Sequence, residues 1–460
     1  MNRSQIKDFT KGKIMSPILI FSLPLFLSNL LQIVYNMVDM IVVGRVLGLE
    51  GISGVSVGGD VTALLTFFAI GFSSAGQVLI ARYIGSGERD KLGRFVGTMF
   101  SFLLSCSLFI SVLGLIFKNH ILELMNTPTA SLDEAMAYSV ICMIGLVFIY
   151  GYNIVSAVLR GMGDSSHPLL FIAIAAAVNV ALDILFVACL DMGAGGAALA
   201  TVISQAVSFI FSLFFLMTKR TEFELHISYK DFLIWDTEML FDLLKLGIPM
   251  AIKMASVQIS KLFVNSYINS YGTDISAFAG IANKISSVSN LVSSAMNTAG
   301  STVVGQNLAA GEFDRVKKIL RCLALITLIV ALTLTLCICI FPNQIFTAFI
   351  SGDNAGETQM ILDIGAGYIP IAVLLFFGGA LRAVMNALIN GSGNTKVNFA
   401  TAIFDGIVLR IGLSLLFGLV LNMEHYGFWL GDALAGFTPF VIGIVFYLSG
   451  AWKKKKEKVA

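Results

Sequence analysis

Charged side chains are scarce in this chain. Only 13% of its 460 residues are Asp, Glu, Lys or Arg, about half the share in soluble proteins, whereas 57% are hydrophobic. So few polar side chains cannot cover the surface of a soluble protein, which excludes a soluble enzyme. The long apolar runs are typical of helices that cross a membrane and too long for the strands of a β-barrel. We therefore expect an all-α polytopic membrane protein.

Cysteine and histidine are also rare. The six cysteines lack the paired spacing of a disulfide framework or zinc site, and the four histidines are scattered. The sequence has no P-loop, HExxH or CxxC motif. The net charge of +2 gives no sign of nucleic-acid binding. We expect no enzymatic activity, no cofactor and no resident metal.

Twelve apolar stretches are long enough to span a bilayer. They cover residues 15–43, 52–81, 95–117, 135–159, 168–190, 194–217, 246–270, 276–305, 322–341, 360–388, 397–420 and 427–451.

The basic residues between these stretches gather on one side of the membrane. If the N-terminus is cytoplasmic, the opposite side receives only Arg45 and Lys118. Nearly all the other basic residues outside the spans then lie in the cytoplasm, including the tail that begins at Lys453. By the positive-inside rule, this predicts an inner-membrane protein with both termini in the cytoplasm.

The two halves of the sequence resemble each other. Gly85-Ser86-Gly87-Glu88 corresponds to Ala309-Ala310-Gly311-Glu312, and Pro24 corresponds to Pro249. Six spans in each half insert the same way up, which predicts two six-helix lobes related by a pseudo-two-fold axis along the membrane normal. The expected parts are a cytoplasmic N-terminus (1–14), an N-lobe (15–217), a cytoplasmic linker (218–245), a C-lobe (246–452) and a basic tail (453–460).

Two acidic residues stand out in the N-half, because an ionisable group inside a membrane is costly. Asp39 and Asp183 are both about 8–10 Å below the outer edge of their spans, so they can meet at one depth. Asn179 shares a helix face with Asp183, and no Lys or Arg lies inside the N-half spans. Such carboxyl groups either take up a proton, which desolvation favours, or hold Na⁺ with their oxygens.

The C-half spans carry charges of both signs. Lys253 and Lys261 in span seven are expected either to face the cavity and contact cargo or a lipid headgroup, or to pair within the protein. Asp405 and Arg410 are five residues apart on one span, about 140° round an α-helix, so they are expected to pair poorly with each other. Asp432 is then a candidate partner of Arg410.

Several motifs together resemble the multidrug and toxic compound extrusion (MATE) family over about residues 14–451. They are Ser22-Leu23-Pro24, Tyr35-Asn36-Met37-Val38-Asp39, Val43-Gly44-Arg45-Val46-Leu47-Gly48, Leu159-Arg160-Gly161-Met162-Gly163-Asp164-Ser165, Asn179-Val180-Ala181-Leu182-Asp183 and Gly195-Gly196-Ala197-Ala198-Leu199-Ala200-Thr201.

The resemblance implies a V-shaped pair of lobes that export substrates by Na⁺ or H⁺ antiport. It also implies an N-lobe cation site formed by Asp39, Asp183, Asn179 and Thr201. Gln32 and Tyr35 would border this site, and Na⁺, if it is the coupling ion, would bind at Asp39, Asn179 and Asp183. Pro24 lets span one bend.

One branch of the family carries acids in spans seven and ten. This chain has Lys253 and Lys261 in span seven and no acid in the middle of span ten, which places it closer to the DinF-like branch.

The sequence thus predicts a monomeric cation-coupled exporter of small organic compounds or drugs, with the lipid bilayer as its surroundings. Two alternatives remain open, because Lys253 and Lys261 are suited to anions. One is a flippase of lipid-linked precursors from the same superfamily. The other is an exporter of an anionic or zwitterionic metabolite.

Overall fold

The structure is a computed structural model that describes residues 5–125, 127–225, 227, 231, 235–348 and 355–453. The predicted basic tail falls, apart from Lys453, outside the described residues, as do the first four residues and parts of the predicted linker.

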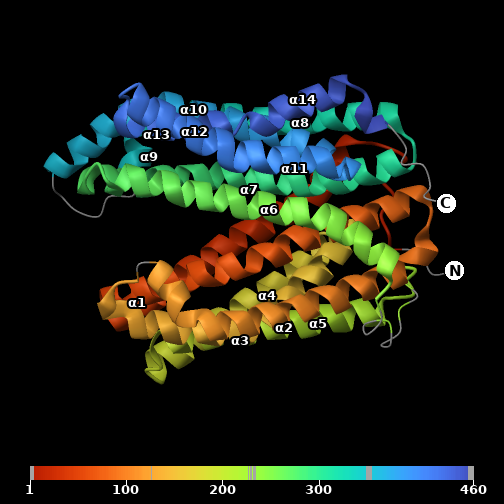
Figure 1. The fold of residues 1–460 in the computed structure, drawn as a ribbon, viewed down its shortest axis with the longest axis horizontal. Coiled ribbons are helices and arrows are strands. Elements are labelled where there is room, and N and C mark those ends of the chain that lie inside the picture. Colours follow the sequence, from red (N-terminus) through yellow and green to blue (C-terminus); the bar gives the residue numbers. More distant parts are fainter. Residues whose placement is uncertain are drawn as a thin grey trace. The chain divides into compact units, whose positions relative to one another are not determined.

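Helices account for nearly all of the described residues, which contain no β-strand. Figure 1 labels the α-helices. They are α1 (Met15–Ser86), α2 (Leu92–Leu124), α3 (Leu132–Gly161), α4 (Ser166–Asp183), α5 (Gly193–Thr218), α6 (Thr237–Asn269), α7 (Thr273–Ala309), α8 (Phe313–Ile340), α9 (Pro342–Thr347), α10 (Ala355–Ser392), α11 (Thr395–Ile403), α12 (Leu409–Leu415), α13 (Glu424–Ala435) and α14 (Thr438–Leu448).

Several of these helices join or divide to form membrane spans. Helix α1 contains two spans, because Gly48 leaves the helical conformation with φ 65° and ψ −151°. Three π-helical segments, Ile184–Cys189, Phe404–Val408 and Leu416–Val420, extend or join α4, α11 and α12. Ten described helical segments are long and apolar enough to cross a membrane. Helices α6 and α7, with 33 and 37 residues, are also long enough but more polar.

The chain packs as two units. Unit 1 consists of Leu23–Ala251 with the described residues before Phe9, and unit 2 consists of Phe9–Ser22 with the described residues from Ile252 onward. The divisions fall inside α1 and α6, one residue before Pro24 and two residues after Pro249.

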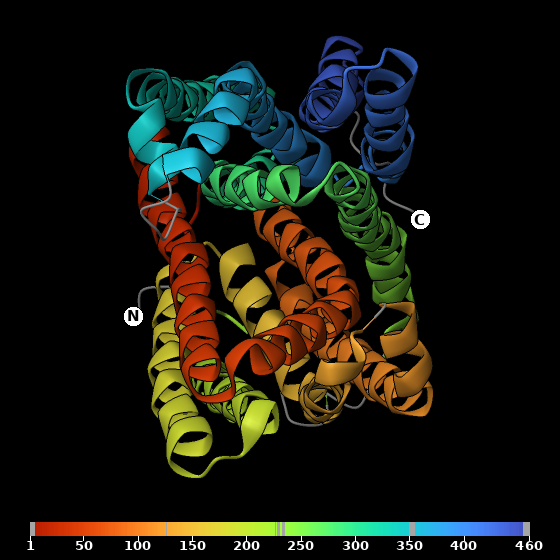
Figure 2. The same cartoon turned by 90° about the vertical axis from the view of Figure 1, so that its left-hand side faces the viewer.

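Within unit 1, α3 packs against α2 and α5, and α4 packs against α5. Within unit 2, α10 packs against α7, α8, α13 and α14. Within each unit the long helices run roughly alongside one another (Figure 1; Figure 2 gives the view turned by 90°).

Large apolar side chains cover the outside of these helices. On α2 the exposed fractions of Leu108, Phe109, Val112, Ile116 and Phe117 run from 51% to 65%. In water such a stripe would be costly, but lipid tails are equally apolar. The exterior is therefore that of a membrane protein.

The predicted repeat is visible in the local backbone. Gly87 and Gly311, 224 positions apart, both have positive φ, and so do Gly163 and Gly393, 230 positions apart. The carboxylate of Asp164 accepts bonds from the backbone N–H groups of Ser166 and His167, and Asn394 caps α11 through the N–H of Val397. The corresponding turns of the two halves are built in the same way.

Candidate functional site

Asp39 and Asp183 lie together in unit 1. Asp39 is on the first half of α1 with 7% of its surface exposed, and Asp183 is the last residue of α4 and fully buried. Their carboxyl groups are close enough to interact directly. The structure thus brings together the two acids that the sequence singles out.

Asn179 and Thr201 join this pair. The side-chain amide of Asn179 on α4 donates to the hydroxyl of Thr201 on α5 at 3.5 Å. Asp39 Oδ1, both carboxylate oxygens of Asp183 and Asn179 Oδ1 are buried, and none accepts a hydrogen bond from the described residues. Four oxygen atoms therefore lie out of water without a donor, which is costly unless a ligand or proton satisfies them.

Tyrosines border the acids on one side. Tyr35 on α1 interacts with Gln32, as the sequence predicts for the edge of the site, and lies near Asp39. Gln32 itself is exposed. Tyr152 on α3 lies near Tyr35. Tyr35 thus lies near Asp39, and Gln32 interacts with Tyr35 from an exposed position on α1.

Two residues of the site, Tyr138 and Cys142, escaped the sequence analysis. Tyr138 on α3 interacts with Thr201 and lies near Asp39, and Cys142, one turn further on, interacts with Tyr138 and Thr62. The analysis weighed mainly charged residues and family motifs, and Tyr138 and Cys142 belong to neither. The only signal is their spacing of four residues, which places them on one face of the helix.

No basic group neutralises the two acids. Across the described ranges neither Asp39 nor Asp183 forms an ion pair within 4.0 Å. Arg160 on α3 donates instead to Gln77 at 3.0 Å and lies near Tyr152. The site has the charge and the oxygen atoms to take a small cation.

The donor set favours a hard cation or a proton over a transition metal. In the portion of the chain that the structure describes, no three His, Cys, Asp or Glu residues gather as a metal site. Carboxylate, amide and hydroxyl oxygens suit hard cations. Two adjacent carboxyl groups can also share one proton, with the protonated group donating to the other.

In unit 2 the acids Asp405 and Asp432 are paired instead. Arg410 Nη2 donates to Asp405 Oδ1 at 2.9 Å, and its Nη1 donates to Asp432 Oδ1. The role expected of Asp432 is confirmed, but the expectation that Asp405 and Arg410 pair poorly is wrong. The segment Phe404–Val408 is π-helical, and a π-helix repeats every i+5, so residues five apart share a face.

The two predicted cavity lysines have different surroundings. Lys253 Nζ donates to Asn386 Oδ1 at 2.5 Å and lies near Asp405. Lys261 lies near Asp432 and lines a small pocket of unit 2. Lys253 is therefore held within the protein, whereas Lys261 reaches a cavity.

Comparison with known proteins identifies the family of the chain. The family model of MatE matches residues 24–185 and 249–416, most of both halves. The chain belongs to the MATE family of membrane transporters. It is a multi-pass membrane protein and not an enzyme, as the lack of catalytic motifs predicts.

Named relatives and solved structures agree with the family. The probable multidrug resistance protein YoeA of Bacillus subtilis is 30% identical over 443 residues, 95% of this chain and 94% of that protein. The probable multidrug resistance protein NorM of Thermotoga maritima is 25% identical over 451 residues, 94% of this chain and 92% of that protein.

The fold matches that of a MOP superfamily transporter from Pyrococcus furiosus, whose binding pocket is described as having reverse polarity. The two share 22% identity with a TM-score of 0.90 over 99% of this chain and 100% of that chain. This confirms the predicted MATE fold of twelve membrane helices in two lobes. The DinF-like branch stays a prediction.

The predicted hinge residue Pro24 interrupts the hydrogen bonding of α1. It lies inside α1, where a proline removes a backbone hydrogen bond. The hydroxyl of Ser28 donates to the carbonyl oxygen of Pro24 at 2.8 Å, and such back-bonding often bends helices.

Proposed function

We propose that this MATE transporter is a cation-coupled antiporter that exports small organic compounds across the cytoplasmic membrane. In this proposal H⁺ or Na⁺ binds at Asp39 and Asp183, with Asn179 and Thr201 completing the site. The observation that carries it is the set of four buried oxygen atoms without a donor among the described residues, three on the two acids and one on Asn179, where neither acid has a basic partner. The names of the relatives, probable multidrug resistance proteins, support organic compounds as cargo.

The cycle is one of alternating access by two lobes, 15–217 and 246–452. The outward-open state takes up the cation at the two acids, which neutralises them. The first helix then bends near Pro24, cargo leaves, and the lobes return to face the cytoplasm. A membrane potential of 100 mV supplies about 2.3 kcal/mol for each elementary charge that enters.

The proposed orientation places both termini in the cytoplasm, and the proposed working unit is a monomer. Each half of the chain supplies one lobe, and both acids that would bind the cation lie within unit 1.

Substitution of the two acids tests this proposal. In a host that lacks other pumps, the wild type should lower the accumulation of ethidium or norfloxacin, and Asp39→Asn with Asp183→Asn should return it to the level of the empty vector. The amides keep the size of the side chains but remove the charge. If the double variant pumps at the wild-type rate, the proposal is wrong.

Asp60 supplies the matched control. It is an acid on the same helix as Asp39 but exposed. Asp60→Asn should export like the wild type at equal amounts of protein in the membrane. A loss equal to that of the double variant would show that charge on α1, not the site, matters.

A further inference from the structure

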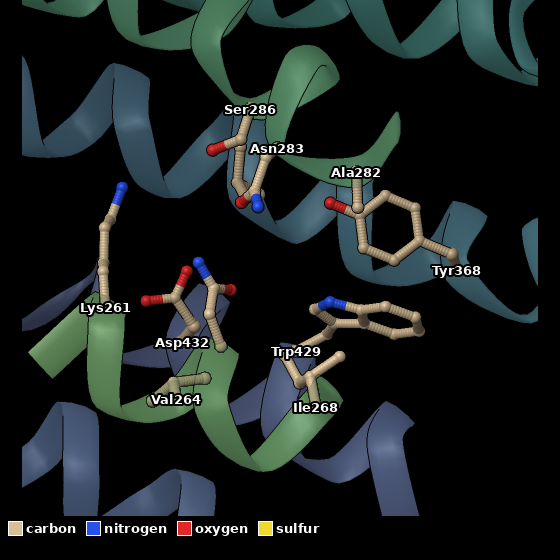
Figure 3. A pocket seen from close by; sticks show the side chains of 11 residues that line it. Lys261, Val264, Ile268, Ala282, Asn283, Ser286, Tyr368, Trp429 and Asp432 are labelled. Atoms are coloured by element: carbon tan, nitrogen blue, oxygen red, sulfur yellow. The ribbon is translucent and has the colours of Figure 1, made fainter. Parts of the chain in front are cut away.

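A pocket in unit 2 combines a charged end with an aromatic end. Figure 3 shows Lys261 and the carboxylate of Asp432 on one side and Tyr368 and Trp429 on the other, with Asn283 and Ser286 near the charged end. The lining comes from α6, α7, α10 and α13. The volume, about 30 Å³, suits a few water molecules or one small ionic group.

The charge around this pocket is positive overall. Four basic residues and two acids interact there, namely Lys253, Lys261, Arg382, Arg410, Asp405 and Asp432. Both acids bond to Arg410, and Asp405 also lies near Lys253, so Arg410 and Lys253 together match the two negative charges. The guanidinium of Arg382 donates to the neutral side chain of Asn290 at 2.8 Å.

Lys261 lacks a close partner. Among the described residues it has no ion pair within 4.0 Å and no hydrogen bond from its ammonium group. Lys261 and Asp432 also line an adjoining pocket of unit 2, and Arg382 lines this second pocket. An ammonium and a guanidinium in excess of the acids are thus available to a ligand.

The internal repeat equates this pocket with the acidic site of unit 1. Asp191 and Asn422, 231 positions apart, share positive φ, as do Gly193 and Glu424. At the same spacing Asn179 corresponds to Arg410 and Thr201 to Asp432. The Asn179–Thr201 pair of unit 1 is therefore an ion pair in unit 2.

The remaining walls correspond as well. Tyr138 and Tyr368 are 230 positions apart, the spacing of Gly163 and Gly393. Pro24 and Pro249 are 225 positions apart, and at this spacing Asp39 corresponds to position 264. Lys261 lies about one helical turn before that position. The framework is shared, but uncompensated acids in unit 1 are replaced by uncompensated bases in unit 2.

We propose that the two adjoining pockets of unit 2 together bind the anionic group, a carboxylate or phosphate, of the transported compound, with Lys261 and Arg382 as its charged contacts. Trp429 and Tyr368 contact the apolar part next to that group. The inference rests on the proposed export function only for transport of the anion; binding stands on the pocket alone. It assigns opposite charges to the two lobes: the cation in one and the anionic cargo in the other.

Trp429 allows a direct binding measurement. The chain has three tryptophans, so Trp235→Phe with Trp452→Phe leaves Trp429 as the only one. In this background, in detergent and without an ion gradient, benzoate should quench the fluorescence saturably. Benzamide and benzylamine, of similar size but neutral and cationic, should bind at least about tenfold more weakly, since a charge-assisted contact is lost. Binding of benzylamine as tight as that of benzoate, or no saturable quenching by benzoate, would overturn the proposal.

Substitutions at Lys261 then identify the contact. Lys261→Gln should weaken benzoate binding about tenfold, whereas Lys261→Arg, which keeps the charge, should stay within about threefold of the parent. Lys284→Gln, at an exposed lysine of α7, should change nothing. A folded Lys261→Gln protein that binds benzoate as tightly as the parent would contradict the assignment. The ligand series needs no Lys261 variant, so it remains decisive if that variant does not fold.

Two further comparisons are needed. The first distinguishes a lipid headgroup from a soluble compound as the source of the anion, and the second distinguishes a failure of this inference from a failure of the proposed antiport. In phosphatidylcholine nanodiscs, competition from added phosphatidic acid would identify a lipid headgroup as the anion, and its absence a soluble compound. Benzoate binding without any ion-coupled transport would retain this inference and remove the proposed antiport. Ion-coupled export without benzoate binding would retain the proposed antiport and overturn this inference.

Discussion

At the scale of single residues, the acids inside the two units have two kinds of surroundings. Asp39 and Asp183 keep oxygen atoms that accept no bond from the described residues, whereas Asp405 and Asp432 bind the guanidinium of Arg410. A guanidinium fixed to the protein cannot leave, but a bound ion can. The first arrangement is therefore suited to transport and the second to structure.

Removal of Arg410 should destabilise unit 2. Arg410→Gln leaves the buried Asp405 and the half-buried Asp432 without their cation, which typically costs about 3–5 kcal/mol. The Tm in detergent should fall markedly, and Asp405→Asn added to Arg410→Gln should recover part of the loss, since the buried position then no longer carries a charge without its cation. A Tm for Arg410→Gln equal to that of the wild type would contradict this role.

The acids of the site could be predicted from sequence because a charge inside an apolar run is conspicuous. Tyr138 and Cys142 could not, because neutral side chains of this kind are common in membrane helices and nothing local separates a site residue from a packing residue. The spacing of four residues from Asp183 indicated Asn179, and a family motif supplied Thr201, which composition alone would not have distinguished.

At the scale of elements, the π-helical segments explain where helix geometry misleads. The angle of 140° between Asp405 and Arg410 assumes a regular α-helix, and Phe404–Val408 is not one. Hydropathy gives no sign of a π-helix, so the pairing lay beyond prediction. Tight helix contacts at glycine are a second feature of this kind.

Gly431 on α13 should not tolerate a side chain. A Cβ there would lie 2.4 Å from the Cα and N atoms of Ser414, which are backbone atoms and cannot move aside. Gly431→Ala should therefore lower stability by about 1–3 kcal/mol, measured as the Tm in detergent.

Gly412 is the control, because a Cβ at this exposed position of α12 meets nothing within 4 Å. Gly412→Ala should leave the Tm unchanged or slightly raised, as alanine favours a helix. Equal effects of the two substitutions would contradict the packing argument.

At the scale of the whole molecule, the twelve spans followed from apolar length and the placement of Lys and Arg. Composition alone finds ten of them in the described residues, because α6 and α7 carry too many polar side chains. Their assignment needed the alternation of basic loops. The packing of Phe9–Ser22 with unit 2 rather than unit 1 was beyond prediction, since it depends on contacts between distant segments such as Arg315 with the carbonyl of Phe9.

The proposed orientation can be tested with single cysteines in a variant that lacks the six native ones. In intact cells a membrane-impermeant maleimide should label Glu50→Cys, at the predicted outer end of span two. It should label Ser86→Cys only after the membrane is opened. Both positions are exposed. The opposite labelling pattern would mean that the orientation is inverted.

The most direct measurement of the central claim is transport in proteoliposomes with a pH gradient and a Na⁺ gradient imposed separately. The account predicts that at least one gradient accelerates cargo movement by the wild type, and that neither accelerates it in the variant carrying Asp39→Asn and Asp183→Asn. Acceleration that persists in the double variant would contradict the claim that these two carboxyl groups bind the coupling cation.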